Sequence, residues 1–303
     1  IDALAEGLPA APESLQGNIE NLVGYSSVPV GLIGPLRVNG LAAKGDFYIP
    51  MATTEGALVA SYHRGAYVIS QAGGATSMCV AESISRAPSF SFGNIREAGL
   101  FISWVLPRFE AFHDLVKTTT SHGRLLGVDM AFNGKVVDLI FNYETGDAAG
   151  QNMVTVATES ICNWIIENTP VKPEHWFLEG NMSGDKKGTM QSFTRNRGRK
   201  VIAEAILPAR IVKRFLNTTP EQMAFYCKVS THGGILSGSI GVQGHYANAL
   251  AAIFIACGQD VACTAEAAMG LTDMEVKEDG SLYVSVSLPN LVVGTVGGGT
   301  HLP

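Results

Sequence analysis

The feature that most restricts the fold of this chain is an apolar stretch near its end, residues 246–268. These residues are apolar almost all round a helical turn, rather than along one side. A helix of this kind lies inside a domain, whereas a surface helix keeps a polar face. We therefore expect a large domain built around a buried central helix that runs through this stretch.

A second pattern, in which helix and strand signals alternate, occupies residues 88–177. Residues 92–119 have the spacing of helices, and residues 152–168 form another helical stretch. Between them, residues 127–144 read as a hairpin that turns at Asn133-Gly134, because Asn-Gly favours the tight turn that joins two antiparallel strands. A helix, a hairpin and a helix make a compact α+β module inserted into the surrounding fold.

The sequence therefore predicts an α+β fold in three segments. The first part of the large domain covers residues 1–87, the inserted small domain covers 88–177, and the second part of the large domain covers 178–303. We expect short extended pieces joined by turns in residues 21–40, where prolines and glycines are frequent. A helix should begin at Thr53 or Thr54, either of which can cap it, and end at Gly73-Gly74.

Two further elements are expected after the small domain. Residues 200–208 alternate as a strand does, and residues 209–218 form a short helix. The basic run at 195–200, Arg-Asn-Arg-Gly-Arg-Lys, is interpreted as a solvated turn between strands. Contact with the phosphates of a nucleotide-bearing ligand is the alternative.

Composition narrows the class of protein. The chain has a net charge of −6 over 303 residues, and it has no long basic stripe that could neutralise a phosphate backbone. General binding of nucleic acid is therefore not expected. The five cysteines are an odd number and form no Cys-x-x-Cys pair, which is typical of buried thiols in a reducing cytosol. No apolar run reaches the roughly 18 residues of a membrane span. We expect a soluble cytoplasmic protein. The chain begins without Met, so a membrane anchor upstream of Ile1 is left as an alternative.

Three acidic or basic sites stand out from their surroundings. Lys186 lies between Asp185 and Lys187 in a loop punctuated by glycines, which suits the binding of an anion. Asp260 lies within the apolar stretch, where a carboxylate is costly unless it is paired. It is either a satisfied structural group or a functional one. Glu55 lies at the expected start of a helix, as a capping acid or as a catalytic acid.

Glycine-rich segments at 146–152 and 295–300 are candidates for contact with a nucleotide. The first places small residues before a helix whose N-terminus can receive a phosphate. Neither segment is a Gly-x-Gly-x-x-Gly motif after a strand, so the ordinary dinucleotide-binding fold is not indicated.

Four segments together resemble the hydroxymethylglutaryl-CoA reductase family, with a eukaryote-like motif set. They are MATTEGALVAS, GNMSGDKKGTM, ACGQDVACTAE and TVGGGT, they follow the family's order, and the resemblance extends over residues 20–300. It implies an NAD(P)H-dependent oxidoreductase whose small domain binds the nucleotide. The implied reaction reduces (S)-3-hydroxy-3-methylglutaryl-CoA to mevalonate and CoA with two NADPH or NADH. It passes through a hemithioacetal and bound mevaldehyde, and no metal is implied.

The resemblance also implies roles for individual residues. Glu55 would be the catalytic acid, Lys186 the cation that stabilises the oxyanion, and Asp260 a catalytic neighbour of Glu55. The implied contacts with the substrate's free carboxylate are Arg86, Asp185 and Lys187. Asn248 would support the reacting carbonyl, and the implied contacts with coenzyme A and the pocket rim are Ser61, His63, Arg64, His245 and Arg210. The implied contacts with the cofactor are Asp147, Asn152, Gly297, Gly298 and Gly299.

The family also implies an assembly, a homodimer or a tetramer of such dimers. Residues 20–24, ENLVG, resemble the family segment at the subunit contact, so the Lys186 loop is expected to meet Glu55 and Asp260 across a subunit boundary. The sequence ends before the region that carries the family's catalytic histidine, and we expect a His-bearing segment to follow Pro303.

Departures from the family pattern leave alternatives open. Glu179 stands where animal members have a small hydroxyl residue, and Arg210 stands where a lysine is usual. A reductase of another acyl-CoA is therefore one alternative, and a silent acyl-CoA- or nucleotide-binding module is another. The segment TTTSHGRLL lacks the arginine that animal members direct at a 2′-phosphate, so the choice between NADPH and NADH is open.

Overall fold

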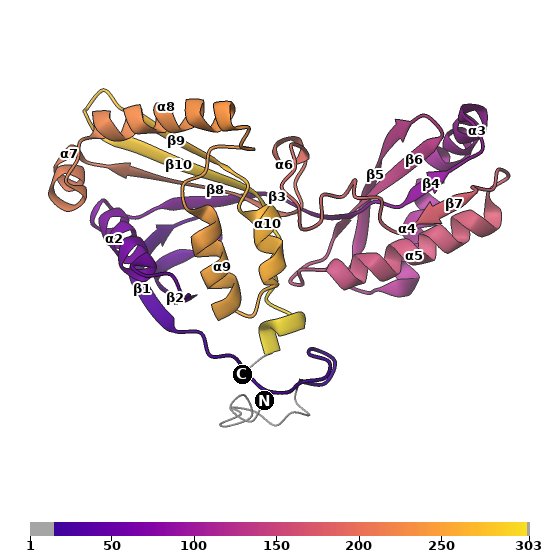
Figure 1. Ribbon diagram of the computed structural model, residues 1–303, viewed down its shortest axis with the longest axis horizontal. Helices are drawn as coiled ribbons and strands as arrows, with labels where there is room; N and C mark the ends of the chain where they lie inside the picture. Colours follow the sequence, from indigo (N-terminus) through magenta and orange to yellow (C-terminus); the bar gives the residue numbers. More distant parts are fainter. Residues whose placement is uncertain (1–14, 302–303) are drawn as a thin grey trace.

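The computed structural model describes residues 15–301, which form two lobes joined by one long strand (Figure 1). That strand is β3 (Thr76–Arg86). Its residues 76–83 pair antiparallel with β8 (Gly198–Leu207) in one lobe, and residues 84–86 pair with β6 (Val136–Glu144) in the other. A single sheet therefore runs through both lobes, in the order β7-β4-β6-β3-β8-β10-β9, with β5 beside β6. The remaining strands of this sheet are β4 (Ser89–Ser91), β5 (Arg124–Asn133), β7 (His175–Phe177), β9 (Leu271–Val276) and β10 (Leu282–Leu291).

The lobe that contains β8, β9 and β10 also holds a separate antiparallel pair, β1 (Val30–Asn39) and β2 (Lys44–Ala52). Helix α2 (Leu58–Gln71) packs on β1, and α9 (Tyr246–Ala256) packs on β2. Helix α8 (Pro220–Ser237) covers β9. The prediction of short extended pieces in residues 21–40 is wrong for residues 30–39, because β1 is one strand of ten residues. The strand absorbs its glycine and proline in an irregularity between Ile33 and Leu36.

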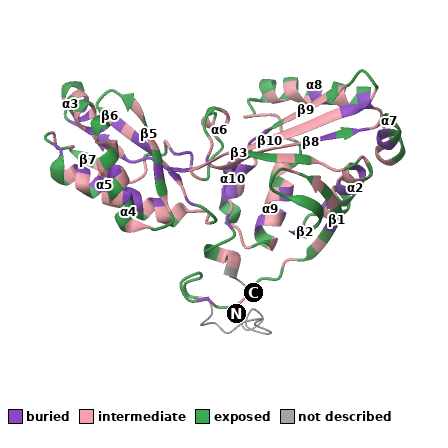
Figure 2. Cartoon of the chain, turned by 180° about the vertical axis from the view of Figure 1, so that it is seen from behind, coloured by how far each residue is buried: buried purple, intermediate pink, exposed green. Residues whose placement is uncertain are grey.

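The other lobe confirms the predicted helix, hairpin and helix. Asn94 caps α3 (Ile95–Val105), a turn of 3₁₀ helix at Leu106–Arg108 follows, and the chain continues as α4 (Phe109–Thr119). The β5–β6 hairpin turns at Gly134, and α5 (Gln151–Asn168) closes the lobe. The α+β class is thus confirmed, whereas the division at residues 87 and 177 into an inserted domain stays a prediction. Buried residues of this lobe are frequent on β6 and on α5 (Figure 2).

The helix expected at Thr53 or Thr54 begins later, and this part of the prediction is wrong. The Thr53 hydroxyl accepts a hydrogen bond from the amide of Glu55, 3.0 Å away, which closes a local turn instead of capping a helix. Helix α2 starts at Leu58, after Ala57 in a left-handed conformation. Its end is confirmed, because the amides of Gly73 and Gly74 bond back to the last turn.

The apolar stretch at 246–268 is not one buried helix. Helix α9 ends at Ala256, and Gly258 turns the chain with a φ of +64°. A 3₁₀ turn (Val261–Cys263) and the short α10 (Thr264–Ala267) follow. Of α9, Ala249, Ala252 and Phe254 are buried, and several other residues are partly open. The glycine overrides the apolar pattern because it readily takes the positive φ that ends a helix.

The remaining short elements are α6 (Gln191–Thr194), α7 (Ala209–Ile211), a π turn at Val212–Leu216, and a 3₁₀ turn at Gly298–His301. The strand and the short helix expected at 200–218 are confirmed by β8 and α7. Within residues 15–301, none of the helices is both long and apolar enough to cross a lipid bilayer.

Candidate active site

A cavity of about 790 Å³ lies where segments from four parts of the chain meet. It is lined by the first residues of α5, by the turn after α9, by the glycine-rich segment that ends in the 3₁₀ turn at 298–301, and by Lys186. Residues 17–19, just before the ENLVG segment, complete the lining within the same chain. This volume is in the range of pockets that hold small ligands and cofactors.

Lys186 and Asp260 form an ion pair at the wall of this cavity, with 2.8 Å between Lys186 Nζ and Asp260 Oδ2. The hydrogen bond to Asp260 raises the pKa of Lys186. Burial acts to raise the pKa of Asp260, but the hydrogen bonds from Lys186 and from the Ala262 amide outweigh it, and the pKa of Asp260 is lowered. Both groups are therefore charged near neutral pH. Asp260 has the partner that its apolar surroundings require.

Asp260 lies at the start of the 3₁₀ turn, not in the middle of a helix as expected. Its neighbour Gln259 shapes the cavity wall, because its side-chain amide donates to the carbonyl of Gly294 and accepts from the amide of Gly294, both at 2.9 Å. Gly258 also needs to be glycine, since a Cβ there would overlap the carbonyl oxygen of Gly299. In the Gly-Gln-Asp sequence, Gly258 forms the turn, Gln259 binds the loop at Gly294, and Asp260 places its carboxylate beside Lys186.

The two glycine-rich segments lie side by side, as a site shared between them requires. The Thr295 amide donates to the carbonyl of Asp147 at 2.8 Å, and Ala148 forms a parallel bridge with Val296. Asn152 and the three glycines Gly297, Gly298 and Gly299 line the cavity. Asp147 does not line it.

Arg86 is nearly buried and is held by groups of its own chain. Its Nη2 donates to the Thr155 hydroxyl at 2.8 Å, and its Nη1 lies 3.4 Å from both Glu179 and Asp185. Asp185 and Lys187 flank Lys186, and Lys187 Nζ donates to the carbonyl of Asp185. None of these three expected carboxylate contacts is among the residues that line the large cavity.

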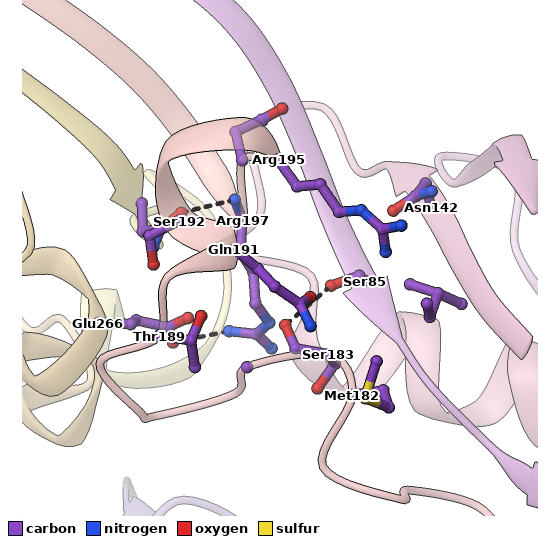
Figure 3. Close-up of a pocket in the computed structure, with 14 residues that line it drawn as sticks. Ser85, Asn142, Met182, Ser183, Thr189, Gln191, Ser192, Arg195, Arg197 and Glu266 are labelled. Carbon is purple, nitrogen blue, oxygen red and sulfur yellow. Dashed lines mark hydrogen bonds and ion pairs between the residues drawn. The ribbon is translucent and has the colours of Figure 1, made fainter. Parts of the chain in front are cut away.

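Two buried residues that sequence reasoning missed contact the Lys186 loop, and Figure 3 shows both among the side chains that line a second cavity. Arg197 and Glu266 are 3% and 1% exposed, and their side chains point toward each other with 2.7 Å between Nη1 and Oε1. This second cavity is small, about 20 Å³. The solvated turn expected at 195–200 is therefore wrong for Arg197. Glu266 could have been found by the argument applied to Asp260, since it too is a carboxylate in an apolar run.

Two other polar residues of the site were also missed. Arg199, again from the basic run, donates to the carbonyls of Gly146 and Val293 and so holds the two glycine-rich segments together. Gln151, at the first turn of α5, donates to Cys263 Sγ at 3.2 Å and to Asp260 Oδ2 at 3.5 Å. Both lie in segments that the sequence analysis singled out, the basic run 195–200 and the glycine-rich segment 146–152, but nothing in the sequence distinguished them from their neighbours.

Glu55 lies apart from Asp260, contrary to expectation. It is exposed in the turn before α2, and Asn248 Nδ2 donates to its Oε2 at 2.6 Å. Lys186 contacts Asp260 of its own chain, so the expectation that the Lys186 loop meets Asp260 across a subunit boundary is wrong, whereas the same expectation for Glu55 stays a prediction. Glu55 and Asp260 belong to opposite ends of α9, because Asn248 holds Glu55 near the start of this helix and Asp260 follows its end.

The expected coenzyme A residues fall into two groups. Ser61, His63 and Arg64 are exposed on α2, and His245 is exposed at the start of α9. These two places are linked because the Tyr62 hydroxyl donates to the His245 carbonyl at 2.6 Å. Arg210 is exposed on α7, at the outer end of the lobe, and is not brought to this group (Figure 1).

Comparison with known proteins shows the family of the chain. The family model for hydroxymethylglutaryl-coenzyme A reductase matches residues 2–303. The 3-hydroxy-3-methylglutaryl-coenzyme A reductase of Pyrococcus horikoshii is 45% identical over 296 residues, which cover 96% of this chain and 71% of that protein. The reductase of Haloferax volcanii is 43% identical over 305 residues, covering 100% of this chain and 74% of that protein.

The fold is also that of a solved structure. The class II reductase from Streptococcus pneumoniae, bound to NADPH in open conformations, superposes with a TM-score of 0.72 over 95% of this chain and 78% of that chain, at 19% identity. The fold, the cavity and the sequence relatives together define an NAD(P)H-dependent oxidoreductase. The chain belongs to the hydroxymethylglutaryl-coenzyme A reductase family, whose reaction is the reduction of hydroxymethylglutaryl-CoA to mevalonate.

Proposed function

We propose that this chain reduces 3-hydroxy-3-methylglutaryl-CoA at the cavity where Lys186 and Asp260 meet. The observation that carries this proposal is the ion pair itself, which places the ammonium group of Lys186 at the wall of a cavity that the two glycine-rich segments also line. A cation fixed in this way can stabilise negative charge that develops on a carbonyl oxygen.

The cavity fits a nicotinamide dinucleotide. The first amides of α5 have no partner within the helix and face the cavity, where they suit a phosphate group. Asn152 and Gly297, Gly298 and Gly299 would hold the remainder of the cofactor, and the glycines let backbone approach it closely. When bound, the cofactor supplies hydride. NADPH and NADH are both compatible with this site, while Asp147 would act through its backbone.

Three side chains would carry the chemistry. The ammonium group of Lys186 would donate a hydrogen bond to the thioester oxygen and stabilise the oxyanion that forms as hydride reaches the carbon. Asp260 would hold that ammonium group in place and keep it charged. Glu55, oriented by Asn248, would hold the proton that completes the alcohol.

The substrate would occupy positions that the single chain only partly provides. Lys187 and Arg86 lie beside the Lys186 loop and would meet the free carboxylate, with Arg86 released from Glu179 on binding. Asp185 would serve this contact by holding Arg86 and Lys187. Coenzyme A would lie along the exposed residues of α2 and the start of α9, which the Tyr62–His245 contact holds together. The structure supports a substrate contact least for Arg210, because α7 lies at the outer end of the lobe.

We further propose that two copies of the chain form each site. Glu55 is exposed, and it does not line the cavity of its own chain. Apolar side chains are also exposed on β1, at Val30 and Leu32, and on α8, at Phe225, Tyr226 and Leu236. Clusters of exposed apolar residues mark protein contact surfaces. A homodimer, alone or doubled to a tetramer, would cover them and bring Glu55 to a partner's cavity.

A cytoplasmic location belongs to the same proposal. All five cysteines are free thiols in the structure. Free thiols suit a reducing compartment, where disulfides are rare.

The proposal is tested by substrate choice. Purified protein is assayed for NAD(P)H oxidation with hydroxymethylglutaryl-CoA and with 3-hydroxyacyl-CoAs that lack the distal carboxylate. We expect oxidation only with the dicarboxylate-derived thioester. Comparable rates with the other thioesters would favour a different acyl-CoA reductase, and tight binding without oxidation would favour a silent binding module.

A further inference from the structure

We propose that Glu266 is a positioning residue for Lys186, and that its carboxyl group, held by Arg197, fixes the main chain of the Lys186 loop. The inference rests on the proposed function, in which Lys186 stabilises the oxyanion. Glu266 does not line the large cavity. Its effect on the reaction would therefore pass through the loop.

The main chain at Lys186 is in a conformation that needs support. Its φ is +55°, in the left-handed region that residues with a side chain rarely adopt. Such a conformation persists when the surrounding contacts determine it. The contact found at this position is the Lys186 amide, which donates to Glu266 Oε1 at 3.2 Å.

Glu266 is itself held in place. Its Oε1 also accepts from Arg197 Nη1 at 2.7 Å, and both side chains are buried. The main chain of Arg197 is fixed in turn, because its amide donates to the side chain of Asn290 at 2.9 Å. The acceptor of the Lys186 amide is thus anchored to the central sheet through β8 and β10.

The same arginine holds the residue that precedes Lys186. Arg197 Nη2 lies 3.0 Å from Asp185 Oδ1. The loop is therefore held at two successive residues, by Arg197 at Asp185 and by Glu266 at the Lys186 amide. From this fixed main chain the Lys186 side chain reaches Asp260 and the cavity. A small displacement of such a side chain can slow a reaction about 100-fold.

The competing explanation is that Arg197 and Glu266 form an ion pair that serves only stability. The two explanations differ in what the variant Glu266→Ala does to a folded enzyme. A stabilising pair changes the unfolding midpoint and leaves kcat unchanged. A positioning residue lowers kcat with little change in KM, because the charge of Lys186 matters most in the transition state.

The test compares three variants with the wild-type protein. Glu266→Ala removes the acceptor, and Glu266→Gln keeps an oxygen that can accept from Lys186. Thr158→Val is the matched control, because Thr158 is fully buried in the other lobe and loses only its hydrogen bond with Tyr143. Hydrogen exchange of the Lys186 amide, followed by mass spectrometry or NMR, is measured together with kcat and KM.

We expect Glu266→Ala to lower kcat about 10- to 100-fold, with KM changed less than about 3-fold. Exchange at the Lys186 amide should become at least about 10-fold faster, since a free amide is unprotected. Glu266→Gln should recover most of kcat. Thr158→Val should lower the unfolding midpoint without changing kcat or this exchange. If Glu266→Ala does not fold, Glu266→Asp replaces it, because its shorter side chain withdraws the acceptor.

Two results would overturn the inference: unchanged exchange at the Lys186 amide in Glu266→Ala, or a kcat equal to that of Thr158→Val. The exchange measurement needs no activity, which separates this inference from the proposed function. If the wild-type protein reduced no thioester, the proposed function would fail. Exchange alone would then decide whether Glu266 positions the loop.

Discussion

At the scale of single residues, the proposed mechanism depends most on the charge of Lys186. Its ammonium group is fixed by Asp260 at 2.8 Å, and no neutral group can replace it. We expect Lys186→Ala to lower kcat roughly 100- to 1,000-fold, the usual loss when an oxyanion partner is removed. Steady-state kinetics with hydroxymethylglutaryl-CoA measure this effect.

A matched control for this variant is Lys135→Ala. Lys135 forms an exposed ion pair with Glu174 in the other lobe, and pairs of this kind contribute little to the free energy of unfolding. The Lys135→Ala variant should therefore have nearly the same kcat and unfolding midpoint as the wild-type protein. A Lys186→Ala variant as active as this control would remove Lys186 from the mechanism.

A second prediction at this scale concerns Glu266 and the pH dependence of the free energy of unfolding. Burial raises the pKa of the Glu266 carboxyl above its ordinary 4.5, and the charge of Arg197 opposes this only in part. The folded state then binds the proton more tightly than the unfolded chain. The stability contributed by this group therefore falls as pH rises from 4.5 through the raised pKa.

The variant Glu266→Gln has no proton to release and isolates this effect. Urea unfolding of both proteins between about pH 4.5 and pH 8 gives the difference in free energy of unfolding, wild type minus variant. We expect this difference to become smaller as pH rises. A difference that grew with pH would show that the Arg197 charge outweighs burial, and that the pKa of Glu266 is lowered.

At the scale of elements, the turn after α9 determines the shape of the site. Gly258 has a positive φ, and a Cβ at this position would overlap the Gly299 carbonyl. We expect Gly258→Ala to push the two segments apart and to weaken cofactor binding about 10-fold or more, because it disturbs both backbone conformation and packing. Fluorescence titration with NADPH and with NADH measures the dissociation constants.

Gly99→Ala is the control for that variant. Gly99 lies inside α3, and a Cβ there meets no atom within 4 Å. Alanine should therefore stabilise the protein by about 0.5–1 kcal/mol without affecting cofactor binding. Equal cofactor affinities in Gly258→Ala and Gly99→Ala would show that the turn does not shape the site.

Much of the element order could be predicted because local signals agree with the fold. The Asn133-Gly134 turn, the Asn94 cap and the alternation in β8 are each determined by neighbouring residues. The break after α9 could not be predicted from apolar periodicity, since a single glycine overrode a strongly helical pattern. Likewise Thr53 formed a local turn where a helix cap was expected.

For the site, the sequence predicted the residues that face the cavity better than those that hold them. Lys186, Asp260 and the glycines of 297–299 line it together, as the family motifs implied. The groups that Arg197, Arg199 and Glu266 hold are distant from them in sequence, except for the Lys186 loop that Arg197 contacts. These contacts depend on the tertiary fold, which the local sequence does not reveal.

At the scale of the whole molecule, the central question is whether one chain completes a site. Lys186 and Asp260 lie in one chain, whereas Glu55 is exposed away from that cavity. Glu55→Gln and Lys186→Ala should each be inactive alone. If the chains exchange subunits, mixing the two variants should restore about a quarter of wild-type activity, because half of the dimers are mixed and each of these has one intact site.

The control for this mixture pairs Lys186→Ala with Asp260→Asn. Both changes affect groups that the structure places in the same ion pair of one chain. No arrangement of such subunits gives a site with both native groups, so no activity should return. Light scattering, or mass spectrometry of the intact assembly, verifies that exchange has taken place in both mixtures.

The measurement that tests the account most directly is the stoichiometry of the reaction. The purified protein is supplied with limiting hydroxymethylglutaryl-CoA and excess NADPH or NADH, and oxidised cofactor, free CoA thiol and mevalonate are all quantified. The account predicts two cofactor molecules oxidised and one thiol released for each mevalonate, with all three formed roughly 100- to 1,000-fold more slowly in Lys186→Ala. Oxidation of one cofactor molecule per thiol with no mevalonate, or full turnover in Lys186→Ala, would contradict it.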